Sequence, residues 1–395
     1  MNDTTSAYSG CIVSLTAVTW DFPLVGRTRM LTEAWRSQCI HSVFVEPPHS
    51  YRSLLRKLIL REHRPLNVVR PLPVRYPVRW WPKLDSRRRR RMMLDRAHGL
   101  RRQLEKYCRL EESAAIVISP MWADWLSALP FARVVYDCID DLSVHAPNSE
   151  FRRLYEQWEA DLLARCTAAI TTAESLKRQL RSKRPDLPIE VIRNGVDPER
   201  FRSLAENKRR PHDLPMSANH DSRPLIGFVG ALFEWIDWEL IRHAATSLPN
   251  YQFVFVGPNN HPGEVESLSS LENVAFLGPR EYEEVPAYVA AFDVCWVPFK
   301  AGDIAFAANP VKMYEYLALG KPVITTKVAD TDSFGDLVKV GTTPDEIITA
   351  LQSESRPAAR SADIVAARIR FAEANSWQVR ARRFIEFLSS IPARD

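Results

Sequence analysis

The strongest constraint on the fold is a regular alternation of two kinds of segment along the chain of 395 residues. Short runs rich in Val, Ile and aromatic residues alternate with longer segments in which apolar residues recur at helical spacing. In the first half the strand-like runs are CIVSLTAV, HSVFVEP, AAIVISP, ARVVYDCI, AAITTA and IEVIRN; in the second they are PLIGFVGAL, YQFVFVG, NVAFLG, DVCWVP and KPVITT. Buried strands that alternate with helices predict parallel sheets.

Length and one turn-forming sequence indicate two domains. A chain of this length is too long for one ordinary hydrophobic core. The sequence RNGVDPERF favours a turn around Asn194 and Gly195, and a polar, Pro-containing stretch follows at 205–224. We therefore predict two Rossmann-like domains, residues 1–195 and 196–375, with a hinge at this turn.

Two segments fall outside the alternation. Residues 47–91 are rich in Pro, Arg and aromatic residues, and we expect an irregular basic insertion there in the first domain. Residues 376–395 are expected to form a C-terminal helix that packs back on the first domain.

Composition places the protein among globular chains. Hydrophobic residues make up 46% and charged residues 26%, and no apolar run approaches the roughly 20 residues of a membrane-spanning helix. The chain starts with no basic region and only a short apolar run, so we expect no signal peptide. The six cysteines are scattered, with no CxxC pair and no metal-ligand spacing, which is typical of reduced core residues in a cytoplasmic protein.

Charge is divided unevenly between the two halves. Residues 1–195 carry 32 Lys and Arg against 21 Asp and Glu, a net charge of +11, whereas residues 196–395 carry 21 against 27, a net charge of −6. The two halves are therefore expected to face different partners. The basic half and its run RRRRR leave a nucleic-acid-binding protein open as a second class of function, which would not explain the other half.

One residue of NPVKMYEYLALGKPVIT, residues 309–325, lies against the local electrostatics. Asn309 is a good N-cap and Pro310 suits the first helical position, so Lys312 is expected at the third position, where the helix dipole favours an acid. A lysine becomes favourable there if the helix N-terminus binds a phosphate. The loop 299–308 leads into this helix from the carboxyl end of a strand, where parallel sheets bind ligands. We therefore expect an anion site at this helix.

Two further residues are candidates for the same site. Glu315 lies three residues after Lys312 and could accept hydrogen bonds from ribose hydroxyls; the alternative is a surface ion pair worth a few tenths of a kcal/mol. Gly230, in FVGAL, suits a tight turn after the first strand of the second domain, where backbone must approach a pyrophosphate, although it could simply be a turn glycine. It belongs to no GxGxxG, which argues against a dinucleotide dehydrogenase.

Three carboxylates lie at a strand end of the first domain, in VVYDCIDDLS: Asp137, Asp140 and Asp141. One of them could be a general base; the alternative is an acid that caps the next helix. The last two also suggest a metal-binding pair. The loop WDFPLVGRTR follows the first strand, so Gly26 and Arg27 should border the ligand cleft; the alternative is a turn glycine and a solvated arginine.

Several motifs together resemble one known family, nearly from end to end. They are YDCIDD, IRNGVDPERF, IGFVGALFEWIDWELI, VAFLGPREYEEVPAYVAAFDVCWVPF and NPVKMYEYLALGKPVI. In these the chain resembles glycosyltransferases of the GT-B fold, particularly the group 1 enzymes of bacterial polysaccharide and teichuronic acid biosynthesis. The resemblance implies an α/β fold of two Rossmann-like domains whose parallel sheets face a central cleft. The C-terminal domain would bind a UDP- or GDP-sugar and the N-terminal domain a saccharide acceptor.

The resemblance also implies roles for single residues. It places Lys312 on the donor diphosphate and Glu315 on the donor ribose. It places Arg280 beside the nucleotide base, where the alternative is a surface arginine. Asp140 matches the catalytic base of the xanthan glucuronosyltransferase in the pattern VYxxxDxLS, with Asp141 at the acceptor side. Enzymes of this fold hold the diphosphate with helix dipoles and basic residues, so no metal and no further cofactor are expected.

The chain departs from the family's pattern at two places. Many members have two glutamates separated by seven residues, but the position eight before Glu315 is Ala307. The Lys-Gly that commonly follows the first loop of the donor domain is absent, and WID stands there at 235–237. An acid that contacts the donor sugar is therefore missing, and we expect Lys312 to do more of the phosphate binding.

These observations predict a metal-independent glycosyltransferase that moves a sugar from a nucleotide-sugar to a hydroxyl of a growing, lipid-linked polysaccharide. Asp140 and Lys312 are the predicted catalytic residues, and Gly230, Arg280, Asn309 and Glu315 complete the predicted donor site. The first alternative is a sugar-nucleotide epimerase of the same fold, and the second is the nucleic-acid-binding protein.

The segment VRWWPKLDSRRRRRMM predicts a contact with the cytoplasmic face of an anionic membrane. Trp80 and Trp81 suit the headgroup boundary, and the basic side chains attract acidic lipids at roughly 1 kcal/mol per charge. These basic residues are Lys83, Arg87, Arg88, Arg89, Arg90 and Arg91. The alternative is a solvated arginine-rich helix with both tryptophans packed inside the insertion.

Overall fold

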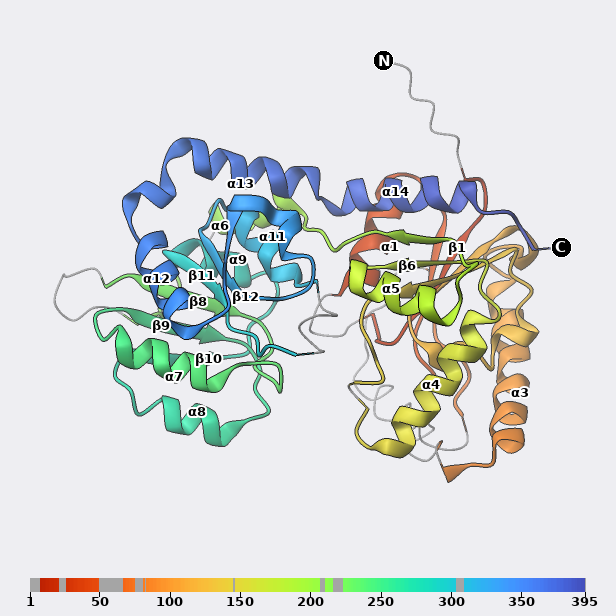
Figure 1. The fold of residues 1–395 in the computed structure, drawn as a ribbon. Helices are drawn as coiled ribbons and strands as arrows, with labels where there is room; N and C mark the ends of the chain where they lie inside the picture. Colours follow the sequence, from red (N-terminus) through yellow and green to blue (C-terminus); the bar gives the residue numbers. More distant parts are fainter. Residues whose placement is uncertain are drawn as a thin grey trace, which may run out of the picture. The chain divides into compact units, whose positions relative to one another are not determined.

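The computed structural model describes residues 8–20, 26–49, 67–74, 81, 83–144, 146–206, 210–215, 223–302 and 309–394. The chain divides into two compact units, the first of residues 1–193 with 380–395 and the second of residues 194–379. Each unit is a parallel β-sheet with helices packed on it (Figure 1). The predicted α/β fold with two parallel sheets is confirmed.

The first unit has a seven-stranded parallel sheet with the order β3-β2-β1-β4-β5-β6-β7. Its strands are β1 (Ile12–Leu15), β2 (Ser42–Val45), β3 (Val68–Val69), β4 (Ala114–Val117), β5 (Arg133–Cys138), β6 (Ala168–Thr171) and β7 (Ile189–Val191). Its helices include α1 (Arg27–Ser37), α3 (Ser86–Leu104), α4 (Ser149–Leu163) and α5 (Glu174–Lys183). The strand order reverses between β1 and β4, and sheets of this kind bind ligands at the carboxyl ends of strands beside such a reversal.

The second unit has a six-stranded parallel sheet with the order β10-β9-β8-β11-β12-β13. Its strands are β8 (Leu225–Val229), β9 (Gln252–Val256), β10 (Val274–Gly278), β11 (Val294–Val297), β12 (Val323–Thr326) and β13 (Val338–Gly341). Its helices are α6 (Pro198–Glu206), α7 (Trp238–Ser247), α8 (Pro262–Leu268), α9 (Val285–Ala291), α11 (Val311–Ala318), α12 (Pro344–Glu354) and α13 (Ala362–Ala374). Here the reversal lies between β8 and β11.

Strand burial explains why the strand-like runs are continuously apolar rather than alternating. All residues of β1, β2, β4 and β11 are buried, because helices cover both faces of a parallel sheet. Helix α7 packs beside α12, while α6 packs beside α9 and α11. The sheet of the second unit therefore lies between two helical layers.

Helix α11 is fixed to its sheet along nearly its whole length. Its residues from Met313 to Ala318 are buried. The Tyr316 hydroxyl accepts the backbone N–H of Val229, the last residue of β8, at 2.9 Å. This bond holds α11 beside the carboxyl end of β8, at the reversal of strand order.

The last segment of the chain packs on the first unit. Helix α14 (Trp377–Ser390) places Phe384 edge-on against Trp35, with ring centroids 5.2 Å apart. Beyond the helix, the backbone N–H of Arg394 donates to the carbonyl of Ala132 at 2.8 Å. These contacts fasten the C-terminal segment to α1 and to the residue before β5.

The segment 47–91 is not irregular throughout. It contains β3, which pairs with β2 at the edge of the sheet, and it ends inside α3. The Arg70 guanidinium, beyond β3, donates to the buried Glu46 carboxylate at 2.6 Å. Residues 50–66 and 75–80 lie outside the described part of the chain.

A buried ion pair connects the start of α1 to strand β5. Arg27 Nε lies 3.0 Å from Asp137 Oδ2, and both side chains are nearly inaccessible, with 3% and 1% exposed. Nη1 of the same arginine donates to the carbonyl of Arg193 at 3.0 Å. The pair therefore fixes a helix start, a strand and the last residue before the second unit.

Replacing Asp137 by Asn should lower the free energy of unfolding by about 3 kcal/mol or more, because it leaves the Arg27 charge buried without its carboxylate. Urea unfolding followed by tryptophan fluorescence measures the change. A control double variant, Arg27→Met with Asp137→Leu, removes both charges and should recover most of the loss. An Asp137→Asn protein as stable as the wild type would contradict the assignment.

Candidate functional site

The start of helix α11 has backbone N–H groups with no side-chain cap. The helix begins at Val311 with Pro310 as N-cap, and its first turn contains no acidic residue. Lys312 is therefore at the second helical position rather than the predicted third. The prediction that Asn309 caps the helix is wrong, because its Oδ1 instead accepts the backbone N–H of Asn194 at 3.0 Å. The uncapped N–H groups and the helix dipole favour a bound anion.

Lys312 and Glu315 form an ion pair in which the acid is buried. Lys312 Nζ lies 3.1 Å from Glu315 Oε2, with 27% of the lysine side chain exposed and 3% of the glutamate. The pair that the alternative expected is therefore present, but its acid is buried rather than on the surface. Removing the lysine would leave a buried carboxylate without its cation, which is far costlier than losing an exposed pair.

Gly230 follows β8 and lies beside Lys312. A Cβ on Gly230 would meet the Phe228 ring at 2.8 Å and would lie 3.7 Å from Lys312 Cε. Gly257, which follows β9 with φ of +147°, packs its backbone against Gly230 so closely that a side chain there would overlap the Gly230 carbonyl. The structure thus brings Gly230, Lys312 and Glu315 together, and the Phe228 ring leaves no room for a side chain at Gly230.

Tyr282 lies beside Glu315 and was not predicted from the sequence. Burial, together with the neighbouring Glu315 carboxylate, raises the pKa of Tyr282 well above its usual value, while the Arg200 charge acts against the shift. The Arg200 guanidinium lies over the Tyr282 ring, 5.7 Å from its centroid. The sequence feature that could have indicated Tyr282 was its position two residues after Arg280, in the motif LGPREY.

Arg280 does not join this group of side chains. Its guanidinium pairs with Asp213, and Nε donates to the Tyr288 hydroxyl at 2.7 Å, which in turn donates to Asp213 at 2.8 Å. Burial would raise the pKa of Asp213, but these two partners outweigh it and lower the pKa. The role of Arg280 beside a nucleotide base stays a prediction.

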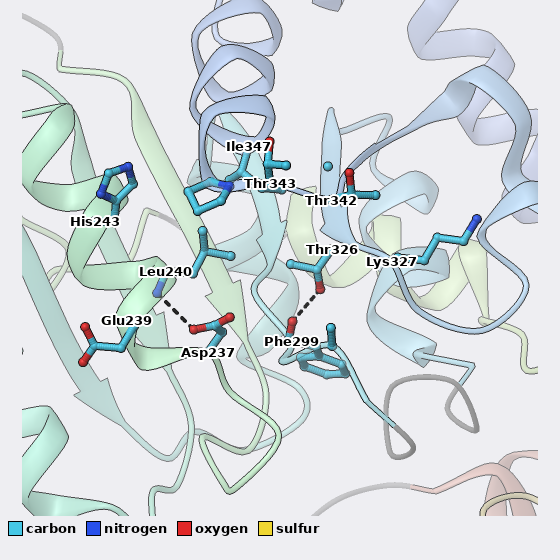
Figure 2. A pocket seen from close by; sticks show the side chains of 13 residues that line it. Asp237, Glu239, Leu240, His243, Phe299, Thr326, Lys327, Thr342, Thr343 and Ile347 are labelled. Atoms are coloured by element: carbon cyan, nitrogen blue, oxygen red, sulfur yellow. Dashed lines mark hydrogen bonds between the residues drawn. The ribbon is translucent and has the colours of Figure 1, made fainter.

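A separate cavity of about 440 Å³ lies beside the carboxyl ends of β12 and β13, between the starts of α7 and α12. Figure 2 shows that its polar side chains come from several elements, among them Asp237, His243, Thr326 and Lys327. Asp237 accepts the N–H of Leu240 at 3.0 Å and thereby caps α7. The cavity lining does not include Lys312 or Glu315, so this is not the anion site.

In the first unit, the two acids that follow β5 have different environments. Asp141 accepts hydrogen bonds from the Ser143 N–H at 3.0 Å and hydroxyl at 2.7 Å, and from Gln179 at 2.8 Å. Burial would raise the pKa of Asp141, but these bonds and the Lys183 charge lower it below its usual value. Asp140 is half-buried and accepts the N–H of Asp141 at 2.8 Å.

Neither acid caps a helix, so that alternative is wrong. The residues that follow form a turn, and the next helix, α4, is capped by Asn148. Asp141 stabilises this turn through its hydrogen bonds with Ser143, whereas Asp140 stays the predicted general base.

Gly26 and Arg27 lie at the carboxyl edge of the first sheet. Gly26 is the N-cap of α1, with no side-chain cap, and both residues line a cavity of about 140 Å³. The cavity also includes Trp20 and Phe44, and the Arg29 guanidinium lies 5.2 Å from the Trp20 ring centroid. The alternative of a solvated arginine is wrong for Arg27, because it is buried against Asp137.

Two family models match the chain. Residues 28–200 match the family described as Glycosyltransferase Family 4, and residues 223–356 match the family described as Glycosyl transferases group 1. Together these matches cover well over half of the chain and reach into both units. The chain belongs to the glycosyltransferases, with a group 1 domain at residues 223–356. The predicted family is confirmed.

This glycosyltransferase is similar to a protein named as a teichuronic acid biosynthesis glycosyltransferase, TuaH of Bacillus subtilis. The two are 29% identical over 209 residues. The match covers 50% of this chain and 51% of TuaH, so it spans about half the length of that relative.

Solved structures share the fold over nearly the whole chain. HepE of Anabaena, in complex with UDP and glucose, is 16% identical with a TM-score of 0.66, covering 96% of this glycosyltransferase and 99% of HepE. A UDP-forming trehalose-phosphate synthase of Burkholderia xenovorans, in complex with glucose-6-phosphate, is 13% identical with a TM-score of 0.70, covering 96% and 99%. At these identities the likeness shows the fold, which confirms the predicted GT-B architecture.

The predicted membrane segment is corrected by the structure at two residues. Trp81 is fully buried and packs edge-on against Trp158, with ring centroids 5.8 Å apart. Arg89 is also buried, over the Trp158 ring and 3.5 Å from Asp124. Neither residue is available to a bilayer. Trp80 lies outside the described residues.

The other arginines of this run are exposed. Arg87, Arg88 and Arg91 lie on the open surface of α3, while Arg90 pairs with Asp124 and Asp161. Among the described helices, none is long and apolar enough to cross a membrane. Within the same residues, no three His, Cys, Asp or Glu side chains form a group that could hold a metal ion.

Replacing Asp141 by Asn should destabilise the first unit at neutral pH, because an amide cannot accept all three hydrogen bonds. The folded pKa of Asp141 is depressed, so its carboxylate contributes fully above the unfolded pKa of about 3.9 and loses this contribution as the pH falls through the folded pKa. The difference in unfolding free energy between wild type and variant should therefore shrink below about pH 4. Urea unfolding at several pH values measures it, and a difference that stays constant down to about pH 2 would contradict the account.

Proposed function

We propose that this glycosyltransferase moves a sugar from a UDP-sugar to a hydroxyl of a saccharide acceptor in the synthesis of a polysaccharide. The observation that carries the proposal is the group formed by Gly230, Lys312 and Glu315 at the uncapped start of α11. The fold relative HepE in complex with UDP supports a UDP-sugar, and the name of TuaH supports polysaccharide synthesis.

On the donor side, the diphosphate would replace Glu315 as the ion-pair partner of Lys312. A diphosphate at the start of α11 meets the helix N–H groups and the Lys312 ammonium, which lies 3.1 Å from its present partner. The carboxylate that is released can then accept hydrogen bonds from the ribose hydroxyls. Charge that develops on the departing diphosphate is met by the same lysine and helix dipole, so the proposed reaction needs no metal.

On the acceptor side, Asp140 would take the proton of the attacking hydroxyl. It lies at the carboxyl end of β5 in the first unit, and its neighbour Asp141 holds the turn. A carboxylate within hydrogen-bonding reach of the hydroxyl is sufficient for general-base catalysis.

Two other activities are distinguished by simple assays. A sugar-nucleotide epimerase of this fold would turn over its donor without an acceptor, whereas the transferase releases UDP in proportion to the acceptor consumed. A nucleic-acid-binding protein would retain nucleic acid on a filter at physiological salt. The family matches favour the transferase.

Replacing Lys312 by Met should weaken UDP binding and lower turnover at least tenfold, about 1.4 kcal/mol or more, because the cation at the anion site is lost. Isothermal titration calorimetry with UDP measures the binding. The single variant also leaves Glu315 buried without a cation, so the control is Lys312→Met with Glu315→Gln, which should recover stability but not UDP affinity. Wild-type affinity in the double variant would sink the proposed donor site.

Replacing Asp140 by Asn should lower kcat by about 100-fold or more and leave UDP affinity unchanged, because the base acts on the acceptor. Steady-state rates with a saturating donor measure the loss. The companion Asp141→Asn should lose stability rather than chemistry. Near-normal kcat in Asp140→Asn would show that another group, or none, removes the proton.

We also propose that the acceptor is lipid-linked and that the exposed arginines of α3 hold the protein on an anionic membrane surface. Arg87, Arg88 and Arg91 are exposed on the first two turns of α3, whose N-terminus is already capped by the Asp85 carboxylate, so these charges are open to anions outside the protein. Lipid headgroup phosphates supply such anions, and each basic residue near the surface is worth roughly 1 kcal/mol.

Replacing Arg87, Arg88 and Arg91 together by Gln should release the protein from vesicles that contain phosphatidylglycerol, and added salt should do the same to the wild type. Co-sedimentation measures the bound fraction. A matched control removes three charges from α5 of the same unit, Lys177, Arg178 and Arg181, and should bind as the wild type does. Equal loss in both variants would mean that net charge, not this helix, determines binding.

A further inference from the structure

The side-chain amide of Asn309 has its oxygen bonded and its nitrogen without a partner. Oδ1 accepts the backbone N–H of Asn194 at 3.0 Å and the Tyr314 hydroxyl at 3.2 Å. The residue is buried, with 4% exposed. Its Nδ2 has no hydrogen-bond partner in the described part of the chain. Two N–H donors are thus held unused directly before the start of α11.

The orientation of this amide is fixed by its neighbours. A backbone N–H can only donate, so the oxygen and not the nitrogen must face Asn194. The Asn194 side chain also donates to the Asn309 carbonyl at 2.6 Å, which holds the main chain of Asn309 in place. Rotation of the amide cannot satisfy Nδ2 without breaking the bond to the Asn194 N–H.

Another buried asparagine in the same unit shows the contrast. Asn273 is 7% exposed, and its Nδ2 donates to the carbonyls of Ala245 at 2.9 Å and Leu248 at 3.1 Å. Buried donors in native proteins nearly always have such acceptors, and one without an acceptor destabilises the empty protein. Asn309 Nδ2 is one of several buried polar atoms without a partner among the described residues, and it lies directly before the uncapped start of α11, where a ligand can supply the acceptor.

We propose that Asn309 Nδ2 donates a hydrogen bond to an oxygen of the donor diphosphate, and that Asn194 and Tyr314 are positioning residues that orient the amide. The inference rests on the proposed function, in which the diphosphate binds at the start of α11. Lys312 must leave the Glu315 carboxylate before it can bind a phosphate. The neutral Nδ2 of Asn309 has no such partner to leave. It therefore provides a donor that is already oriented in the empty protein.

Titration of the full-length protein with pyrophosphate and with UDP tests the assignment. Asn309→Ala should weaken both ligands at least tenfold. Asn309→Asp keeps an oxygen for Asn194 and Tyr314 but loses the donor and buries a negative charge, so both affinities, measured on the folded protein, should fall further. Because salt screens a buried charge only weakly, the neutral variant Asn309→Ala measures the part of the loss that is due to the missing hydrogen bond.

The control is Asn273→Asp, which removes a partnered donor. It should lower the melting temperature and leave pyrophosphate affinity unchanged in the folded protein. The positioning role is tested by Tyr314→Phe, which should weaken pyrophosphate about threefold in the wild type but have no further effect in Asn309→Ala. Equal effects of Tyr314→Phe in both backgrounds would show a merely structural role.

The remaining outcomes are distinct. Wild-type affinity for pyrophosphate in both Asn309 variants would overturn the inference alone, provided that Lys312→Met still weakens UDP. Loss of affinity for a UDP-sugar with normal affinity for UDP and pyrophosphate would also overturn it, because the amide would then meet the sugar. A wild-type protein that binds no nucleoside diphosphate would instead overturn the proposed function.

Discussion

A buried carboxylate needs a cation, and Glu315 has one in Lys312, one helical turn away and 3.1 Å distant. In water such a pair contributes little, but burial of the acid makes loss of the cation costly. The pair keeps both charges at the start of α11 when no ligand neutralises either. In the function that we propose, a diphosphate offers the lysine a second partner. Binding then exchanges one ion pair for another, while the freed carboxylate becomes available to ribose.

The two residues at the junction between the units, Arg193 and Asn194, are each hydrogen-bonded through the backbone to a side chain of their own unit. Arg27 donates to the carbonyl of Arg193 in the first unit, and Asn309 accepts the N–H of Asn194 in the second. Arg27 is neutralised by Asp137 on β5. Asn309 directly precedes the helix that carries the Lys312–Glu315 pair. The junction is thus bonded on each side to a residue at the carboxyl edge of a sheet, where ligands bind in folds of this kind.

Local sequence pattern predicted the parallel sheets, because strands covered on both faces are apolar throughout. It also predicted Lys312 as an anomaly, because helix-end electrostatics depend only on near neighbours. What it could not show were pairings between distant residues. Arg27 and Asp137 are 110 residues apart in the chain, so local sequence left a solvated Arg27 open as an alternative.

The same limit explains the errors at Trp81 and Asn309. A tryptophan beside a basic run suits a membrane surface, yet Trp81 packs on Trp158 from a distant helix. An asparagine before a helix suits a cap, yet Asn309 bonds to Asn194, 115 residues earlier. The most direct test of the central claim is a crystal structure with UDP bound. We predict that Lys312 Nζ contacts a phosphate oxygen and that Glu315 accepts the ribose hydroxyls; a Lys312–Glu315 pair left intact, with the phosphates bound elsewhere, would contradict the account.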